Sequence, residues 1–142
     1  MKKVILVLIA VFSLLGLDAC KPKNKADTAI DAAHNSRNSV NWDGVYRGVI
    51  PAADGPGINV EIVLRLDETY SIGYQYVDRG EESFTEAGTF QWNDAGSAIE
   101  LDVKNMPPHY QVGENRLIQL DMSGEKITGD FADDYVLEKV LE

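Results

Sequence analysis

The amino-acid sequence predicts an all-β fold, a small antiparallel barrel of about seven or eight strands over residues 41–142. Apolar residues recur there with a period of two, short polar turns separate the runs, and no useful length of chain has the period of a helix. A two-sheet sandwich fits the same strand spacing. Because most runs present one polar face, a single sheet that closes around the apolar side chains is the more economical arrangement.

The first half of the domain is expected to contain three strands. The first is expected at Val45 to Ile50, directly after Trp42, which would plug one end of the barrel. The next two are expected to form a hairpin around the polar turn at residues 66–70. The side chains expected on the inner face of that hairpin are Ile58, Val60, Ile62, Leu64, Leu66, Tyr70, Ile72, Tyr74 and Tyr76.

The second half is expected to contain four or five strands. A run from Phe84 to Trp92 meets a second run at residues 99–103 across Asn, Asp and Gly residues that favour a turn. Later strands are expected near Tyr110, at Arg116 to Met122 and at Tyr135 to Val140. The aromatic side chains of the domain are expected to fill its core rather than line a pocket.

Residues 1–19 have the pattern of a signal peptide. Two lysines precede an apolar run of 14 residues from Val4 to Leu17. A helix needs roughly 20 residues to span a bilayer, so the run is too short for a permanent anchor. The run ends at Leu17-Asp18-Ala19-Cys20, which resembles a bacterial lipobox, with Asp18 a poor fit. We expect lipid attachment at Cys20, since the alternative is an incidental thiol left exposed in an exported chain.

Residues 20–40 are expected to carry the lipid on Cys20 and to form a flexible tether. The segment is rich in Lys, Asn, Ala and Ser and has few large apolar side chains to bury. Several acyl chains would hold the protein stably on a membrane. Lys21 follows the Cys in place of Asp, which by resemblance to bacterial lipoproteins favours the outer membrane.

The charge of the chain excludes some partners. With 13 Lys plus Arg against 23 Asp plus Glu, the chain has a formal charge of −10 and no basic footprint for nucleic acid. Residues 41–142 hold seven basic and 20 acidic side chains, a net charge of −13. This surface favours a basic patch on a partner, through steering rather than tight fit. A single Cys excludes an internal disulfide and a multi-cysteine zinc site.

Side chains that could bind a metal are sparse. Met106 and His109 flank two prolines and, with Met122, could offer thioether and imidazole ligands to copper, but packing at a loop is the commoner role for such residues. The acidic residues at 130, 133 and 134 lack the spacing of a calcium-binding loop and are expected to lie in a solvated turn. We therefore expect no metal site and no cofactor.

Catalysis is also not expected. We find no nucleophile with a base partner and no Gly-rich phosphate loop, and a His-dependent triad would have to use His34 or His109. Carboxylate pairs are common in so acidic a chain and carry no information by themselves. The sequence predicts a protein that is not an enzyme and has no catalytic residues.

Several separated segments carry a family resemblance. Residues 42–58, 83–92 and 112–121, followed by 127–129 and 135–139, resemble in order the N-terminal domain of the NlpE family of bacterial outer-membrane lipoproteins. The resemblance covers almost all of residues 42–140. The resemblance implies a small lipocalin-like barrel. It also implies a connection with copper resistance, surface adhesion and envelope-stress signalling. Larger family members carry a second, OB-like domain, which is not found in this sequence.

One loop departs from the family pattern. Members of the family often have a Cys-x-x-Cys pair after the proline that matches Pro51, and here those positions are Ala52 and Gly55. Without these thiols, neither soft ligation of Cu(I) nor a redox switch is available at the loop. The loop at residues 51–57 is expected to be mainly a turn. Its alternative role is an altered binding loop whose remaining polar side chain is Asp54.

The sequence therefore leads to one functional expectation and two alternatives. The expectation is a non-catalytic lipoprotein, held on the outer membrane at its periplasmic face or at the cell surface, that serves envelope homeostasis through protein contacts at the barrel rim. Copper tolerance and stress or surface sensing are the roles that the resemblance implies. The alternatives are a carrier of a small apolar ligand inside the barrel, and a surface adhesin.

Overall fold

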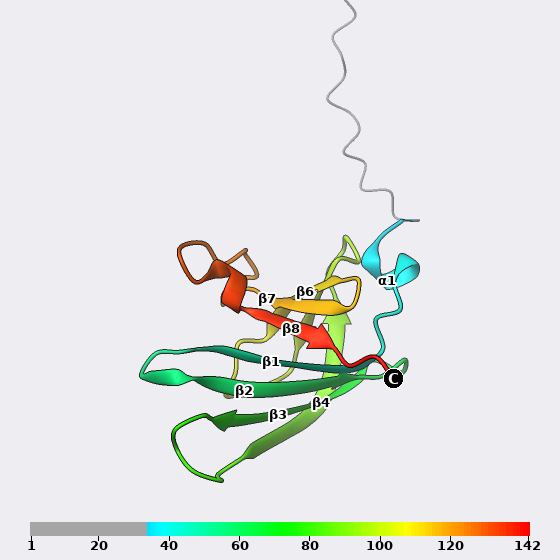
Figure 1. Ribbon diagram of the computed structural model, residues 1–142. Helices are drawn as coiled ribbons and strands as arrows, with labels where there is room; N and C mark the ends of the chain where they lie inside the picture. The colour runs from blue at the N-terminus through cyan, green and yellow to red at the C-terminus, as the bar shows by residue number, and fades with distance from the viewer. Residues whose placement is uncertain (1–33) are drawn as a thin grey trace, which may run out of the picture.

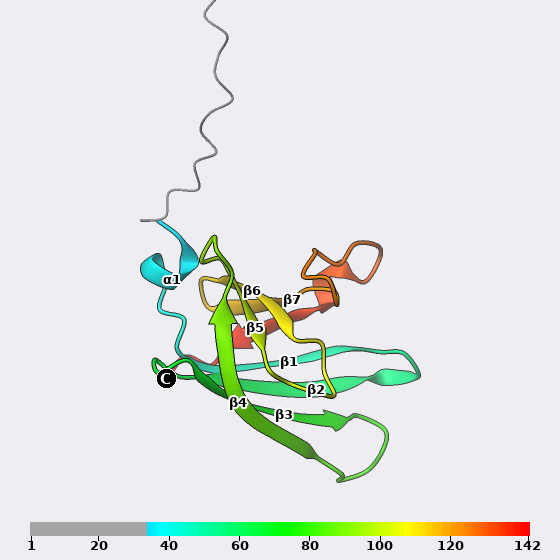
Figure 2. The same ribbon diagram turned by 180° about the vertical axis from the view of Figure 1, so that it is seen from behind.

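The structure is a computed structural model that describes residues 34–142 (Figures 1 and 2). Eight strands form a closed barrel in which each strand pairs antiparallel with the next and β8 closes back on β1. The all-β fold and the number of strands are confirmed. The expected signal peptide and Cys20 lie outside the described residues. The elements are α1 (Ser36–Ser39), β1 (Gly44–Ala52), β2 (Gly55–Leu64), β3 (Thr69–Tyr76), β4 (Phe84–Trp92), β5 (Ala98–Leu101), β6 (His109–Gly113), β7 (Arg116–Gln119), η1 (Ala132–Asp134, a 3-10 helix) and β8 (Val136–Lys139).

One hydrophobic core fills the space between the strands. The alternating residues of β2 and β3 meet in register, as in the pair Ile62 and Ile72, so that both side chains point into the barrel. Buried side chains from all eight strands belong to this one cluster, including the fully buried Tyr46, Tyr70 and Tyr110. The expectation that aromatic residues fill the core agrees with this arrangement.

Two residues lie elsewhere than the periodicity suggested. Leu66 was expected to continue the inner face of β2, but its side chain is 74% exposed. The strand ends at Leu64 because the chain turns back, with Arg65 N donating a hydrogen bond to Thr69 O. The seventh strand was expected to reach Met122 but ends at Gln119, beyond which Leu120 makes an isolated bridge to Lys126 and Met122 is exposed.

One end of the barrel is closed by the segment before β1. Helix α1 lies against the β4–β5 turn and β6, with Arg37 N donating to Gly96 O at 3.0 Å and Ser36 Oγ donating to Val112 O at 2.7 Å. The Trp42 ring is buried against Phe90 at a centroid distance of 5.8 Å. Residues 35–40, assigned to the tether from their composition, therefore contact the barrel.

The opposite end carries the β1–β2 turn, the η1 segment and the β3–β4 turn. In both views of the ribbon this hairpin end lies far from α1 and from the C-terminus (Figures 1 and 2). The chain that leads to Cys20 thus enters the barrel at one end, and the loop that departs from the family pattern lies at the other.

Candidate functional site

The β1–β2 hairpin brings together the loop residues singled out in the sequence. Ala52 and Gly55 face each other as the last paired residues of the two strands, beyond a register shift between Ile50 and Ala52. Asp54 lies in the turn, where its carboxylate accepts a hydrogen bond from Arg79 Nη2 at 2.7 Å. This exposed ion pair links the turn to the β3–β4 connection, and the Arg79 guanidinium balances the charge of Asp54.

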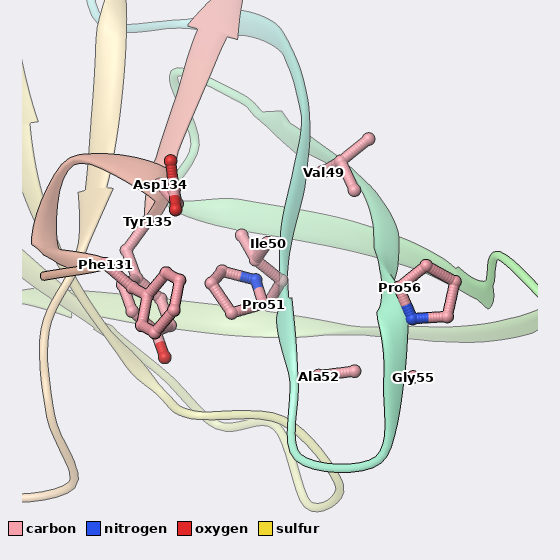
Figure 3. A pocket seen from close by; sticks show the side chains of 9 residues that line it. All are labelled: Val49, Ile50, Pro51, Ala52, Gly55, Pro56, Phe131, Asp134 and Tyr135. Atoms are coloured by element: carbon pink, nitrogen blue, oxygen red, sulfur yellow. The ribbon is translucent and has the colours of Figure 1, made fainter.

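A pocket lies beside this hairpin and extends to η1. Its volume is about 450 Å³, within the range of clefts that hold small ligands. Figure 3 shows Phe131 and Tyr135 on the η1 side of β1 and Pro56 on the β2 side. We call this site the rim pocket; it is lined by Val49, Ile50, Pro51, Ala52, Gly55, Pro56, Phe131, Asp134 and Tyr135.

Apolar side chains are exposed at this pocket. Phe131 is 67% exposed and Val49 is 53% exposed, although most large apolar residues of the domain are buried in the core. Exposed apolar side chains that gather at one place mark candidate interaction sites, whereas scattered ones need no explanation. The rim pocket is such a place.

The strand beside the pocket pairs with β8 over only part of its length. β8 pairs with β1 only at Tyr46 and Arg47, although β1 continues to Ala52. Val140 N donates to Val45 O, and bonded and non-bonded pairs alternate along an antiparallel ladder. Continued by two residues, this register places Val136 of β8 opposite Val49, and the Val136 carbonyl oxygen lies 2.6 Å from where a Cβ of Gly48 would stand. β8 and η1 therefore occupy this side of β1.

The electrostatics of the rim pocket are acidic. Asp134 lines the pocket, and its carboxylate makes no ion pair with a basic side chain among residues 34–142. Asp133 lies beside it on η1, and Asp130 shortly before. The Asp78 carboxylate lies near Gly55, about 3.3 Å from where a Cβ would stand. A basic ligand would find unpaired carboxylates on both sides of the apolar lining.

The structure also locates the weak metal candidates. Met106 is buried in the core, Met122 is exposed, and the ring of His109 on β6 lies beside the turn at Gly124. Among residues 34–142, no group of three or more His, Cys, Asp or Glu side chains is arranged to hold a metal ion. The acidic residues expected in a solvated turn belong to η1 and the residues just before it, next to the rim pocket.

Buried tyrosines in the barrel interior have raised pKa values. Burial, with a smaller effect of the nearby Asp43 charge, raises the pKa of Tyr46 to about 12, and its hydroxyl donates to Trp42 O at 2.7 Å. Burial and the Asp102 carboxylate raise the pKa of Tyr70, and burial raises that of Tyr110. These hydroxyls stay protonated at neutral pH, and the three tyrosine side chains are part of the hydrophobic core.

A second hollow of about 660 Å³ lies over the outer faces of β1 to β4. Gly73 forms part of its lining, and Arg47 and Glu61, which also line it, make an ion pair at 2.5 Å. Val49 belongs to the lining of this hollow and of the rim pocket. Because its charged side chains are already paired, this hollow offers less to a ligand than the rim pocket does.

Comparison with known proteins decides the family. A family model described as the NlpE N-terminal domain matches residues 46–130, more than half of the chain. The chain belongs to the NlpE family. The resemblance seen in the sequence is thereby confirmed.

Similar proteins extend this result over almost the whole chain. Lipoprotein NlpE of Escherichia coli strain K12 is 32% identical over 141 residues, covering 96% of this chain and 57% of the relative. The chain thus spans a little over half the length of that curated relative. Membership of the NlpE family supports an envelope lipoprotein.

Solved structures of two proteins share the fold. The crystal structure of a candidate lipoprotein from Shewanella oneidensis matches with a TM-score of 0.68 and 39% identity, covering 74% of this chain and 94% of that one. The crystal structure of NlpE from E. coli, described as a Cpx pathway activator, matches with a TM-score of 0.51 and 28% identity, covering 71% of this chain and 50% of that one. The NlpE barrel is therefore the fold of this chain.

Most residues of the rim pocket could not be predicted from the sequence. The hairpin residues Ala52, Asp54 and Gly55 were singled out, but only Ala52 and Gly55 line the pocket. Phe131 and Tyr135 come from a segment almost eighty residues later, and only the contact between η1 and β1 brings them there. A Phe within an acidic, turn-rich segment is the signal in the sequence that could have found it. Within the described residues of this NlpE-family chain, no helix has the length and apolar character needed to cross a membrane.

Proposed function

We propose that this protein is a non-catalytic outer-membrane lipoprotein, attached through lipid on Cys20, that serves envelope homeostasis through protein contacts. Copper tolerance and the sensing of stress or of surfaces are the processes in which we expect it to act. Membership of the NlpE family supports this proposal, as does the description of E. coli NlpE as an activator of the Cpx pathway.

The observation that carries the proposal is the placement of the two ends. The chain from Cys20 reaches the barrel at α1, and the rim pocket lies at the hairpin end (Figure 1). The 15 peptide units between Cys20 and Asn35 span at most roughly 50 Å when fully extended. An anchor on Cys20 would hold the α1 end toward the membrane and leave the hairpin end facing outward, where another protein can reach it.

The rim pocket favours protein contacts over the carriage of a ligand inside the barrel. The inward side chains of all eight strands pack together, whereas the rim pocket lies outside the barrel. A carrier would hold its ligand in the interior, between those side chains. An adhesin would need the hairpin end to face the outside of the cell, so protease treatment of whole cells separates adhesion from a periplasmic role.

The proposal is tested with Cys20→Ala in the bacterium that encodes the protein. Wild type should carry acyl chains at residue 20 in a mass spectrum and fractionate with the outer membrane. The variant should lose both, and should fail to restore copper tolerance or the response of an envelope-stress reporter in a deletion strain. A variant that is not acylated but restores the deletion strain in full would overturn the anchored part of the proposal.

A further inference from the structure

Exposed apolar side chains also gather at the α1 end of the barrel, opposite the rim pocket. Leu66 in the β2–β3 turn is 74% exposed, Leu141 after β8 is 70% exposed, and Val140 beside it is exposed as well. We call these three residues the apolar end patch. We infer that this patch docks on the surface of the bilayer that holds the lipid of Cys20, with its side chains among the lipid headgroups. This inference rests on the proposed function and adds a second, non-covalent contact with the membrane.

The three side chains of the patch lie around the start of β1. Gly44, the first residue of β1, pairs with Leu64 on one side, and on the other side Val45 O accepts a hydrogen bond from Val140 N. Neighbouring strands lie about 4.8 Å apart, so the chain leading to Leu66 and the chain at Val140 are separated by only about 10 Å. In both views of the ribbon the β2–β3 turn lies beside the C-terminal end of the chain (Figures 1 and 2). The three residues therefore form one patch, and such a patch marks a candidate interaction site.

The chain that precedes the described residues determines what meets this patch. It enters the barrel at α1, which contacts the same turn, since Arg37 Nη2 donates to Glu68 Oε1 at 2.9 Å. The 15 peptide units between Cys20 and Asn35 span at most roughly 50 Å. A lipid on Cys20 keeps the patch within that reach of the bilayer, at an effective concentration on the order of millimolar. Even a weak contact of apolar side chains with the headgroup region is then populated.

The charges at the two ends of the barrel favour the same orientation. At the hairpin end, residues 53–54, 77–83 and 129–134 contain one basic side chain, that of Arg79, and seven acidic ones: Asp54, Asp78, Glu81, Glu82, Asp130, Asp133 and Asp134. The acidic residues of the α1 end are accompanied by more basic ones, namely Arg37, Arg65, Arg116 and Lys139, and Lys21, Lys23 and Lys25 follow Cys20 in the sequence. Anionic lipids attract basic segments and repel acidic ones within a Debye length. An anionic bilayer therefore favours the α1 end.

The test uses residues 20–142, in which Cys20 is the only thiol. This part folds on its own, since its eight strands close one barrel around one core and the similar S. oneidensis chain crystallised with the same fold. The thiol is coupled to a maleimide-headgroup lipid in vesicles of phosphatidylethanolamine and phosphatidylglycerol. A second lipid carries a diazirine near its headgroup, and mass spectrometry locates the residues that cross-link to it under light. We expect cross-links within residues 64–68 and 138–142 and none at Val49 or Phe131.

A matched pair of double variants tests the side chains of the patch. Leu66→Ser with Leu141→Ser should lower cross-linking within residues 64–68 and 138–142 roughly threefold or more, because two of the three apolar contacts are lost. Val77→Ser with Met122→Ser is the control, since both side chains are exposed and belong neither to the patch nor to the rim pocket. This control should leave cross-linking unchanged. Urea unfolding of both double variants checks that the barrel is intact.

Three results would overturn the inference. They are equal cross-linking of the two double variants, cross-links of wild type spread over both ends of the barrel, and cross-links at the patch that appear only when many chains share one vesicle. Because the coupled lipid replaces the native one, these results would leave the proposed function standing, which depends on acylation of Cys20 in cells. Leu66→Ser alone removes one of three contacts and keeps the tether, so the barrel should stay at the membrane with its hairpin end free.

Discussion

Gly88 on β4 leaves the space that the Asp102 carboxylate occupies. A Cβ at Gly88 would collide with Asp102 Oδ1, which accepts a hydrogen bond from Thr89 N at 3.1 Å. β4 pairs with β5 only from Phe90 onward, so the segment after β5 closes this gap through Asp102. Nearby, backbone N–H of Lys104 and the Asn105 side chain bind Glu86 and lower the pKa of its carboxyl. Gly88 thus leaves room for the Asp102 carboxylate to bond β4 at a point where β4 and β5 are not paired.

Replacing Gly88 should destabilise the barrel. We expect Gly88→Ala to lower the free energy of unfolding by about 1–3 kcal/mol, because the added methyl group displaces Asp102. Gly73→Ala is the matched control in β3, since the nearest atom to its Cβ lies 3.9 Å away and the substitution should be neutral or slightly stabilising. Urea unfolding followed by fluorescence measures both. Equal effects of the two substitutions would show that Asp102 moves aside at no cost.

The contact of α1 with the barrel should contribute to stability. Ser36→Ala removes the hydrogen bond to Val112 O, and we expect a loss of about 1 kcal/mol. Ser39→Ala is the control, because Ser39 lies in the same helix and is exposed. Thermal unfolding of the two variants measures the difference. A loss no larger for Ser36→Ala than for Ser39→Ala would mean that α1 detaches readily in solution.

Alkaline pH should destabilise the barrel through Tyr46. Its pKa is raised to about 12 by burial and then by Asp43, whereas the unfolded chain ionises near 10. Tyr46 therefore contributes stability that is complete below about pH 10 and is lost as pH rises toward 12, because only the unfolded state releases the proton there. Tyr46→Phe should make the fall in unfolding free energy over this window shallower. An unchanged slope in urea titrations at these pH values would contradict the assignment.

Restoring a cysteine pair should create a copper site. Ala52 and Gly55 are paired across the end of the hairpin, so Ala52→Cys with Gly55→Cys places two soft ligands side by side. We expect this double variant to take Cu(I) from a chelator under anaerobic conditions, and Ala52→Cys alone to do so much less. The φ of +153° at Gly55 should make the metal-free double variant less stable than wild type.

Wild type in the same titration should leave Cu(I) with the chelator. Tight stoichiometric binding by wild type that disappears in Met106→Ala or His109→Ala would restore a direct copper role through substitute ligands. Met106→Ala needs a check of folding, since its side chain is part of the core.

The fold could be predicted from the sequence because local and tertiary preferences agree. In β2 and β3 every second residue is apolar, and the turn between them holds Glu68 at a φ of 62°, a position that short polar turns tolerate. The prediction was wrong at Leu66 because periodicity alone does not show where a strand ends. The contact of α1 was missed because it depends on single hydrogen bonds, such as that of Ser36, rather than on an apolar pattern.

The candidate site was less predictable. The hairpin could be found from its prolines and glycines, but the pocket depends on η1 meeting β1 over a long sequence separation. In the sequence, Asp134 is one of several acidic residues expected in a solvated turn. It becomes a candidate binding residue only because the structure places it in the rim pocket together with Phe131. A prediction of which residues of β1 lie beside η1 would have required knowing where β8 stops pairing with β1.

The most direct test of the account compares exposed apolar residues at the two ends of the barrel. Phe131 at the rim is 67% exposed and Leu66 at the α1 end is 74% exposed, so replacing either with serine should leave the fold intact. Both variants are expressed at equal, lipid-modified levels in the deletion strain, and the envelope-stress reporter is measured. We expect Phe131→Ser to lose most of the response and Leu66→Ser to keep it. An undiminished response with Phe131→Ser, or a loss with Leu66→Ser alone, would contradict a functional rim that faces away from the membrane.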